Sequence, residues 1–387
     1  MKALKEAVIV AYGRSGIGRA NKGSLANLHP VDFGGRVLKG VLERVPQLEP
    51  KDIEDVIVGC SRAEGIQGYN LGRLVSLRAG VPYTAAAQTV NRFCSSGLQS
   101  LATAANTIMT GQAEVIVAGG VERMSAMPMG AAPEIRCSWL SEHQPNAYMS
   151  MGLTAENVAD KYNISAYQME EFAIVSHRRA AAAQAAGKFD EEIVGLEVVN
   201  AAGQTVIFNQ DEGVRAGTSH ESLAKLAAVF KENGKVTAGT ASQMSDAAAF
   251  VVMMSADKAK SVGAQPIARF VSFAVAGMDP AYMGMGPVYA VPKALKYAGL
   301  ELKDIDVIEL NEAFAAQALP CISELGMDSA KVNPNGGAIA LGHPLGATGA
   351  VLTCKVIGEL KRTAGKYGMI TMCIGGGMGA AGIIELL

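Results

Sequence analysis

The feature that most constrains the fold is a pattern of apolar segments that occurs twice along the chain. Short apolar runs that end in turn residues begin near residues 6 and 267, as expected of buried strands. The segments EPKDIEDVIVGC and LELKDIDVIELN, which end at Cys60 and Asn311, both carry Lys-Asp-Ile before an apolar strand. A third pair, GQAEVIVAGGVERM and KYGMITMCIGGGMG, runs from a strand into glycines. The members of each pair lie roughly 250 to 260 residues apart, which indicates an internal duplication.

Helical patterns lie between the repeated strands. The segments PVDFGGRVLKGVLERV and PVYAVPKALKYAGL occupy corresponding places in the two halves. Alternation of strand and helix predicts an α/β fold with parallel sheets covered by helices. A chain of 387 residues is also too long for one ordinary core. We therefore expect an N-terminal half over residues 1–262 and a C-terminal half over residues 263–387.

An insertion of about residues 121–244 separates the repeated strands of the first half from the second half. It contains a helical stretch in which Ser165 and Gln168 have capping-box spacing and Gly187 ends the helix. A second stretch, DEGVRAGTSHESLAKLAAVF, predicts turns and a short amphipathic helix. The insertion is interpreted either as a lid or ligand-binding subdomain, or as a purely structural excursion.

The overall composition excludes several classes of protein. The formal net charge of −2 provides no general basic surface for nucleic acid or an acidic membrane, so an anionic ligand must be held locally. No apolar run is long enough to span a bilayer, and the N-terminal run fits a strand better than a signal sequence. The six cysteines form no Cys-x-x-Cys pair and no zinc-ligand spacing, so no metal site is expected. They read as reduced thiols of a cytoplasmic protein.

Cys94 is the first candidate for chemistry. The segment TVNRFCSSGLQSLATAANTIMTG predicts a strand that ends near Val90 and a helix that begins near Ser96. Cys94 then lies just before a helix N-terminus, where backbone N–H groups and the helix dipole stabilise a thiolate. The alternative is an incidental core cysteine, but the strand-to-helix position followed by Ser-Ser-Gly favours a nucleophile.

His343 is the candidate base. It lies in NPNGGAIALGHPLGATGA, where the many glycines indicate close approach of a ligand, although a structural loop histidine remains the alternative. The other histidines lie in polar segments that are expected to be exposed: His29, His143, His177 and His220. Under the duplication the His343 loop corresponds to the Cys94 elbow, and Asn311 corresponds to Cys60. Corresponding elbows of a duplicated unit meet at a shared centre, which predicts that Cys94 and His343 are neighbours.

Cys373 ends a strand and precedes the run GGGMGAAG. A second thiol in a glycine-lined turn suits an acid and base for carbon, and the glycine N–H groups suit a developing oxyanion. Gly377, Gly379 and Gly382 also match a dinucleotide-binding fingerprint. That fingerprint requires a further helix, strand and acidic residue, and the chain ends at Leu387, so we discard it.

Four separated motifs, in order, resemble those of the thiolase family: NRFCSSGLQS, ELNEAFAAQ, NGGAIALGHPLGATGA and TMCIGGGMGAA. The resemblance runs essentially end to end. It implies a five-layered αβαβα fold made of two duplicated halves with an inserted loop domain. It also implies cleavage of 3-ketoacyl-CoA by coenzyme A to acetyl-CoA and a shortened acyl-CoA in fatty acid β-oxidation, or the reverse Claisen condensation.

The family pattern assigns roles to particular residues. It implies that His343 takes the proton of Cys94, that Cys94 carries the acyl group, and that Cys373 protonates the departing acetyl-CoA enolate. One oxyanion hole would consist of His343 and a water held by Asn311, and the other of the N–H groups of Cys94 and Gly375. This set provides a nucleophile, a carbon acid and base, and donors for two oxyanions.

The resemblance also implies a coenzyme A site against the loop domain. Coenzyme A enters as a substrate, and no tightly bound cofactor is expected. The matching positions are Arg215, Ser222, Ala238 and Ser242, with Met151, Phe230 and Phe314 along the pantetheine channel. A guanidinium at Arg215 suits an anionic nucleotide. Thiolase-like chains form homodimers or homotetramers, and some relatives assemble with a hydratase/dehydrogenase partner.

Several positions depart from the common family pattern: Ser150, Thr240, Ala247 and Ala347. None of them removes a catalytic group. The pattern around Arg215 and Gln243 is closer to that of degradative 3-ketoacyl-CoA thiolases than to acetoacetyl-CoA-specific acetyl-CoA C-acetyltransferases, which remain the main alternative. A ketoacyl synthase, a non-catalytic acyl-CoA or sterol carrier and a cysteine hydrolase fit the motifs less well. The acyl length and the physiological direction stay open.

Overall fold

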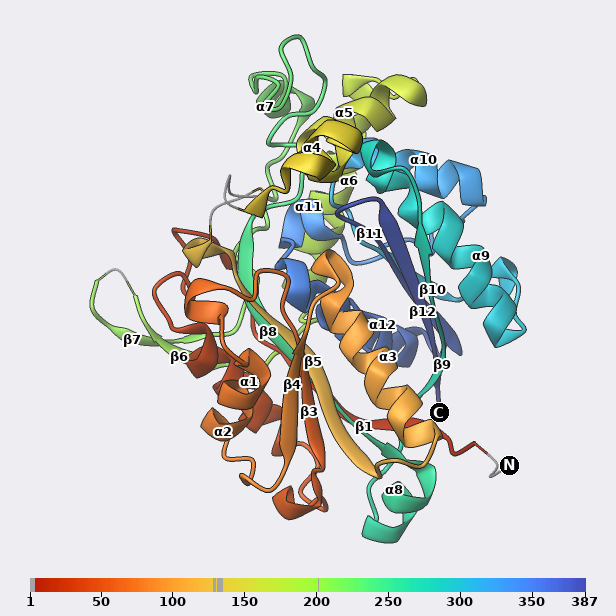
Figure 1. The fold of residues 1–387 in the computed structure, drawn as a ribbon. Helices are drawn as coiled ribbons and strands as arrows, with labels where there is room; N and C mark the ends of the chain where they lie inside the picture. The colour runs from red at the N-terminus through yellow and green to blue at the C-terminus, as the bar shows by residue number, and fades with distance from the viewer. Residues whose placement is uncertain (1–3, 128–129, 131–134, 201) are drawn as a thin grey trace.

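A computed structural model describes residues 4–127, 130, 135–200 and 202–387 (Figure 1). The strands are β1 (Ala7–Arg14), β2 (Gly18–Arg19), β3 (Asp55–Gly59), β4 (Ala86–Val90), β5 (Val115–Arg123), β6 (Leu196–Val199), β7 (Thr205–Phe208), β8 (Ser245–Ser255), β9 (Ala268–Gly277), β10 (Val307–Leu310), β11 (Tyr367–Ile374) and β12 (Met378–Leu386). The helices are α1 (Pro30–Leu42), α2 (Leu71–Arg78), α3 (Ser96–Met109), α4 (Ser138–His143), α5 (Met151–Lys161), α6 (Ala166–Ala185), α7 (His220–Leu223), α8 (Ala256–Val262), α9 (Gly286–Ala298), α10 (Ala315–Leu325), α11 (Ala338–Leu341) and α12 (Thr348–Thr363).

The main sheet consists of two half-sheets joined edge to edge. Its strand order is β10-β11-β12-β9-β1-β8-β5-β3-β4, with the short β2 paired to β8. The join between β1 and β9 is brief, because only Val8 with Arg269 and Ile9 with Ala268 pair there. On either side of it, β8-β5-β3 and β12-β11-β10 follow the same order outward, so the duplication predicted from the sequence is present in the fold.

The two half-sheets differ at their outer edges. In the first half, β3 pairs in parallel with β4 over five residue pairs that begin with Asp55 and Ala86. In the second half, the corresponding pairing is reduced to an isolated parallel bridge between Ile308 and Val332. The helix starts correct one detail of the predicted alignment. The corresponding helices α3 and α12 begin at Ser96 and Thr348, and the same spacing places Asn311 opposite Gly59 of the first half rather than Cys60.

Helices cover both faces of each half-sheet and give five layers. The helices α1 and α2 pack on the outer face of the first half-sheet, and α9 packs on the outer face of the second. The helices α3 and α12 pack against each other between the half-sheets, where they appear side by side in Figure 1. This arrangement confirms the predicted αβαβα fold.

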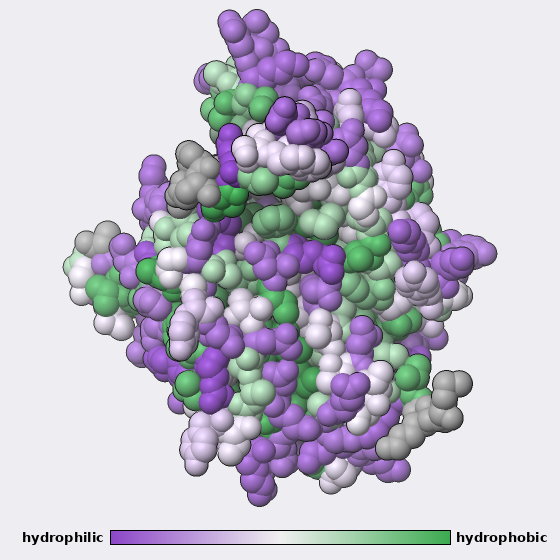
Figure 2. All heavy atoms as spheres, in the orientation of Figure 1, coloured by the Kyte–Doolittle hydropathy of each residue, from purple (hydrophilic) through white to green (hydrophobic). Residues whose placement is uncertain are grey.

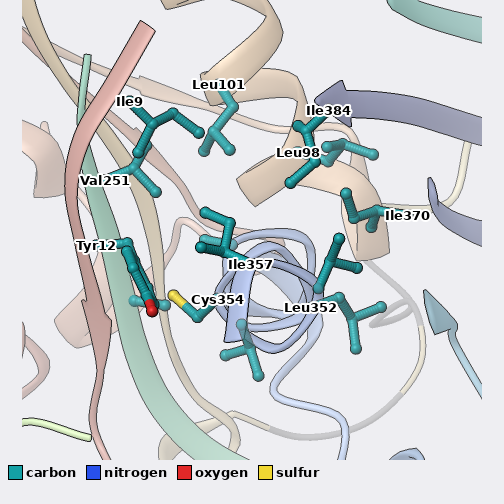
Figure 3. Close-up of a cluster of buried hydrophobic side chains, with 14 of the residues drawn as sticks. Ile9, Tyr12, Leu98, Leu101, Val251, Leu352, Cys354, Ile357, Ile370 and Ile384 are labelled. Atoms are coloured by element: carbon teal, nitrogen blue, oxygen red, sulfur yellow. The ribbon is translucent and has the colours of Figure 1, made fainter. Parts of the chain in front are cut away.

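The central layer is an apolar core built by the two corresponding helices. Leu98 and Leu101 of α3 and Ile357 of α12 are fully buried, and they converge with Ile9 and Ile370 from the two half-sheets (Figure 3). Burial of each such side chain stabilises the fold by about 1.5–3 kcal/mol. The apolar face of α3, the helix that follows Cys94, is therefore the face that joins the two halves.

Most of the segment between β5 and β8 forms the upper lobe in Figure 1, with α4, α5, α6 and α7, whereas the β6–β7 hairpin projects at the left beside the first half. The predicted capping box is present, since Ser165 and Gln168 cap α6, and Gly187 with φ of +66° follows its end. The stretch predicted to hold turns and a short helix contains α7. Only His220–Leu223 is helical, because Ser219 caps this turn and irregular backbone follows it.

Hydrophilic side chains cover the tip of the lobe around α7, whereas the surface below it is mixed (Figure 2). Within the described residues, no helix combines the length and the apolar character needed to cross a membrane. The proposed division of the chain at residues 262 and 263 stays a prediction.

Candidate active site

The predicted elbow at Cys94 is present. The strand β4 ends at Val90 and α3 begins at Ser96, as the sequence indicates, and a 3₁₀ turn, η3 (Phe93–Ser95), connects them. Cys94 lies in this turn and is half-buried. A half-buried thiol at a turn can be reached by a substrate while its surroundings remain partly desolvated.

Local hydrogen bonds hold this turn in an unusual conformation. Phe93 has φ of +43°, which a residue with a side chain rarely adopts. The Asn91 side chain accepts the N–H of Phe93 at 2.8 Å. The Ser96 hydroxyl accepts the N–H of Arg92 at 2.9 Å and donates to the carbonyl of Phe93 at 2.6 Å. These contacts fix the backbone that presents Cys94 and account for the Ser-Ser-Gly sequence that follows it.

A second elbow meets the first. The turn η9 (Leu345–Ala347) precedes α12 as η3 precedes α3, and the two turns pack together. Glycines allow this approach. A Cβ added at Gly97 would lie 2.8 Å from the carbonyl oxygen of Gly346, and one added at Gly349 would lie 2.2 Å from the Leu98 nitrogen. The duplication therefore brings the Cys94 turn and the His343 segment to one centre, as predicted.

His343 lies just before η9 and is 5% exposed. Its Nδ1 is 2.7 Å from the Thr348 hydroxyl, and its Nε2 is 3.4 Å from Asn311 Nδ2. If Asn311 donates to Nε2, the ring proton resides on Nδ1 and points to Thr348. Burial lowers the pKa of His343 to about 4, so the ring is neutral at physiological pH. A neutral imidazole with an unprotonated Nε2 can accept a proton.

Asn311 has one unsatisfied atom. It follows β10 and is fully buried, and its Oδ1 accepts no hydrogen bond from the described residues. A buried polar atom of this kind is costly unless a bound group satisfies it. This is consistent with the expectation that Asn311 holds a water beside His343.

The Cys94 thiol is in the neutral form at rest. Burial raises its pKa to about 11, although the N–H groups of Gly375 and of Cys94 itself hydrogen-bond the sulfur and oppose the shift. Desolvation therefore outweighs the N–H donors at the helix N-terminus, and a base is needed to remove the proton of Cys94. The same donors are those that the sequence assigned to an oxyanion.

Cys373 lies near the end of β11 and is 1% exposed. Burial, with further contributions from the charges of Cys94 and Cys321, raises the pKa of Cys373 well above its usual value. After it, Gly376 and Gly377 both have φ of +80°, which allows β11 to turn back into β12. The two candidate thiols therefore share one site, with Gly375 between them.

The predicted pantetheine-channel residues also gather here. Phe314, Met151 and Phe230 belong to the same apolar cluster as Cys373. The rings of Phe230 and Phe314 meet edge to face, with centroids 5.9 Å apart. A Cβ added at Gly375 would lie 3.4 Å from the Met151 sulfur, which places α5 beside the glycine turn.

The predicted nucleotide contacts are more dispersed. Arg215 and Ala238 are exposed, and Ser242 is half-buried with its N–H donated to the Ala313 carbonyl at 2.9 Å. Ser222 is exposed, and its hydroxyl already donates to the Ser219 carbonyl at 2.8 Å. Burial, with the nearby charge of Arg19, lowers the pKa of Arg215. Their contact with coenzyme A stays a prediction.

One histidine was misjudged from the sequence. His177 is 3% exposed rather than solvent-exposed, because it lies on the inner face of α6. Its Nδ1 accepts the N–H of Arg215 at 3.1 Å, and burial together with the Arg215 charge lowers its pKa to about 4. His177 is therefore a neutral acceptor that holds the Arg215 backbone.

Sequence reasoning also missed Glu122, at the end of β5. This carboxylate is fully buried and accepts the N–H groups of Ser61 at 2.7 Å and Gly346 at 2.8 Å, together with the Gln67 side chain. It thus ties the second elbow to the first half. An acidic residue directly after an apolar strand with two glycines was the available signal.

Comparisons with known proteins agree with the motifs. Residues 7–257 match the family model described as thiolase, N-terminal domain, and residues 264–386 match thiolase, C-terminal domain. A 3-ketoacyl-CoA thiolase of Bacillus subtilis is 51% identical over 99% of this chain and 100% of its own length. Beta-ketothiolase BktB of Cupriavidus necator is 46% identical over 98% and 99%. The crystal structure of the Bacillus anthracis acetyl-CoA acetyltransferase superposes with a TM-score of 0.92 at 40% identity, with 100% of both chains covered.

Proposed function

The chain belongs to the thiolase family of acyltransferases, and on this premise we propose that it cleaves 3-ketoacyl-CoA with coenzyme A, giving acetyl-CoA and a shortened acyl-CoA. The observation that carries the proposal is the convergence of two thiols with a neutral histidine. Cys94 and Cys373 share the glycine turn at Gly375, and His343, which contacts Asn311, lies just before the elbow packed against that of Cys94.

The first half-reaction transfers the acyl group to the protein. His343 Nε2 accepts the Cys94 proton, and the sulfur attacks the C3 carbonyl carbon of the substrate. The C2–C3 bond then breaks, and its electron pair forms the enolate of acetyl-CoA. Cys373 donates its proton to C2, which releases acetyl-CoA and leaves an acyl-Cys94 thioester.

The second half-reaction returns the protein to its starting state. The thiol of a second coenzyme A gives its proton to the Cys373 thiolate and attacks the acyl carbon. Cys94 leaves as a thiolate and recovers its proton from His343. The products are one shortened acyl-CoA and the original protonation states, so atoms and protons balance.

The pKa values support formation of the thiolate only when substrate is present. A thiol with a pKa of about 11 does not transfer its proton spontaneously to an imidazole with a pKa of about 4. The transfer becomes favourable when negative charge moves to the substrate oxygen, where donors such as His343 and the Gly375 N–H can stabilise it. A free thiolate is thereby avoided in the resting protein.

The coenzyme A site is proposed at the junction of the lobe and the sheets. The apolar walls around Phe230 and Phe314 suit the pantetheine arm, and the exposed Arg215 suits the anionic nucleotide. Coenzyme A is here a substrate rather than a resident cofactor. A cytoplasmic location is part of the proposal and is supported by six free thiols, all in described segments.

A 3-ketoacyl-CoA thiolase is favoured over an acetoacetyl-CoA-specific acetyltransferase by the higher identity to the Bacillus subtilis relative, 51%, than to the Bacillus anthracis acetyltransferase, 40%. Such a reaction would serve fatty acid β-oxidation. The discriminating experiment is coenzyme-A-dependent cleavage of acetoacetyl-CoA and 3-ketohexadecanoyl-CoA by the wild type and by Cys94→Ser. Cleavage of the long substrate that is lost in the variant supports the proposal.

Activity confined to acetoacetyl-CoA would move the protein to the acetyltransferase alternative. If the wild type cleaves neither substrate, the proposal is wrong. Cleavage that persists in Cys94→Ser would remove Cys94 from the mechanism while leaving the reaction assigned.

We also infer a homodimer through the edge of β4. This strand pairs with β3 alone among the described strands, and Tyr69 and Tyr83 nearby are 93% and 82% exposed. Ala86 donates its N–H to the Glu54 carbonyl at 2.9 Å, so the N–H of Ala87 points away from β3. Ala87→Pro should therefore yield monomers in analytical ultracentrifugation, and an unchanged dimer would contradict this interface.

A further inference from the structure

The segment from Thr240 to Ser245 connects the two sides of the candidate site. The N–H of Ser242 donates to the Ala313 carbonyl at 2.9 Å, next to the segment that carries Asn311. The N–H of His343 donates to the Gln243 carbonyl at 3.0 Å. The backbone of this segment thus contacts His343 directly and Ala313, two residues after Asn311, and a shift of Gln243 would move the His343 backbone.

The side chain of Gln243 reaches in the opposite direction. Its Oε1 accepts a hydrogen bond from Arg215 Nη2 at 3.3 Å. Its Nε2 lies within hydrogen-bond distance of three carbonyl oxygens, those of Gly213 at 2.9 Å, Ile339 at 2.9 Å and Ala340 at 3.0 Å. One amide therefore joins the Arg215 loop to the end of α11, directly before His343.

The loop that contains Gly213 packs closely against the end of α11. A Cβ added at Gly213 would lie 2.5 Å from the Ala340 carbonyl oxygen and 2.9 Å from Gln243 Nε2. The loop that carries Arg215 is therefore packed against α11, and His177 fixes the Arg215 N–H at 3.1 Å from the other side. Closely packed elements of this kind transmit small displacements.

Arg215 is the exposed end of this chain of contacts. Its guanidinium pairs with no carboxylate among the described residues, and its contact with Gln243 Oε1 at 3.3 Å is a long one. Arg19 adds positive charge nearby. An anion bound to Arg215 would supply the missing counter-charge and reorient the guanidinium relative to Gln243.

We propose that Gln243 is a positioning residue that couples binding of the coenzyme A nucleotide at Arg215 to the placement of His343. The nucleotide then raises turnover as well as affinity, because remote binding energy is used to orient the reacting groups. The role requires an amide, which offers an acceptor to Arg215 and donors to the carbonyls at once. The inference rests on the proposed acyl transfer and on Arg215 as the nucleotide contact.

The experiment compares acetoacetyl-CoA with acetoacetyl-pantetheine, which lacks the nucleotide. For the wild type we expect kcat to be higher with the coenzyme A thioester by about tenfold, in line with one hydrogen bond to a charged group, in addition to a lower KM. The kcat ratio and the KM ratio are those of acetoacetyl-CoA to acetoacetyl-pantetheine. In Gln243→Met the kcat ratio should fall to about one while the KM ratio keeps its wild-type value, since Arg215 still binds the nucleotide.

Two further variants sharpen the comparison. Gln243→Glu keeps an acceptor for Arg215 and loses the donors to the carbonyls, so its kcat ratio should also fall to about one. Gln168→Met is the matched control. Gln168 caps α6 through the Ser165 N–H at 2.9 Å and touches neither Arg215 nor the His343 segment, so its kcat ratio should stay at the wild-type value.

The outcomes are separable. A wild type with equal kcat for both thioesters, or a Gln243→Met variant with an unchanged kcat ratio, overturns the coupling while leaving the acyl transfer intact. A wild type that cleaves neither thioester overturns the proposed function itself. Should Gln243→Met fail to fold, Arg215→Met decides the matter. Loss of the kcat ratio supports the coupling, and loss of the KM ratio alone contradicts it.

Discussion

The two elbows at the centre of the molecule have the same backbone plan and different chemistry. In the first half, η3 leaves Cys94 half-buried, and Phe93 beside it is 43% exposed. In the second half, η9 and the preceding His343 are almost wholly enclosed, and His343 is 5% exposed. The comparison teaches that duplication supplied two turns at one centre. One turn became accessible to substrate, and the other became a buried support for proton transfer.

The interiors of the two halves also diverge behind the elbows. Ile57 of β3 pairs with Ala118, and the corresponding ladder position in the second half is Glu309, paired with Ile370. Glu309 forms a buried ion pair with Lys355 of α12 at 2.6 Å, and Lys355 also donates to the Gly336 carbonyl at 2.7 Å. The ion pair thus holds the glycine-rich segment before His343 through the Gly336 carbonyl. At the ladder position of Glu309, the first half has the apolar Ile57.

The largest effect is expected from replacing, one at a time, the residues that precede the two elbows. His343→Ala is expected to lower kcat for thiolytic cleavage by about 10³-fold, because it removes the proton acceptor of Cys94. Asn91 is the corresponding residue of the first elbow, where its side chain accepts the Phe93 N–H at 2.8 Å and donates to the Ser61 carbonyl at 3.0 Å. Asn91→Ala should lower kcat less than about tenfold. Equal losses would mean that the two elbows are not chemically distinct.

The next effect concerns the ion pair behind the second elbow. Lys355→Met should reduce the free energy of unfolding by about 3–5 kcal/mol, because it leaves Glu309 buried and unpaired. The double change Glu309→Ile with Lys355→Met, which imitates the first half, should recover most of that loss. Urea denaturation measures both. If the double variant is no more stable than the single one, Lys355 acts mainly through Gly336 rather than through the charge pair.

A smaller effect is expected on stability in acid, to which His343 of the second elbow contributes. The folded-state pKa of His343, about 4, lies below the ordinary value of 6.5, so the unfolded chain binds the proton more tightly. Stability from this group is complete above pH 6.5 and is lost as the pH falls to 4, by about 3 kcal/mol. His343→Gln should remove this part of the acid slope in denaturation measured at several pH values.

His177, with a pKa also near 4, contributes a second such term that His343→Gln leaves in place. The variant should therefore flatten the acid slope only in part. An acid slope identical to that of the wild type would show that His343 is not buried as a neutral ring.

The smallest effect should come from the paired hydroxyls at the two helix starts. Thr348 contacts His343 Nδ1 at 2.7 Å, and Ser96 locks the Cys94 turn. Thr348→Val should lower kcat by about tenfold with little change in stability, because only the orientation of the ring is lost. Ser96→Ala should instead cost about 1 kcal/mol of stability. Steady-state kinetics and thermal unfolding of both variants provide the check, and a reversed pattern would contradict it.

Much of the centre could be predicted because repeats and motifs are local signals. The spacing between repeated strands predicted that the Cys94 and His343 elbows meet, and the motif around Asn311 predicted a third partner at His343. The strand end at Val90 and the helix start at Ser96 followed from apolar periodicity alone.

The remainder depends on contacts between distant segments. From the sequence alone, Glu122 would be interpreted as a solvent-exposed charge after a strand. Its hydrogen bond from the Gly346 N–H joins segments that are far apart in the sequence and forms only in the folded protein. His177 was predicted to be exposed because the sequence of α6 does not show that the backbone at Arg215 contacts this residue. The sequence shows the helix N-terminus that favours a thiolate at Cys94, but it does not display the desolvation that raises the pKa of this thiol.

The central claim is that the first elbow carries the acyl group and the glycine turn carries the carbon acid. It is tested most directly by incubating the wild type with acetyl-CoA, quenching in acid, and locating the acetyl group by peptide mass spectrometry. The account predicts acetylation of the peptide that contains Cys94 and of no peptide that contains Cys373. Acetylation of Cys373, or an unmodified Cys94 in an enzyme that turns over, would contradict it.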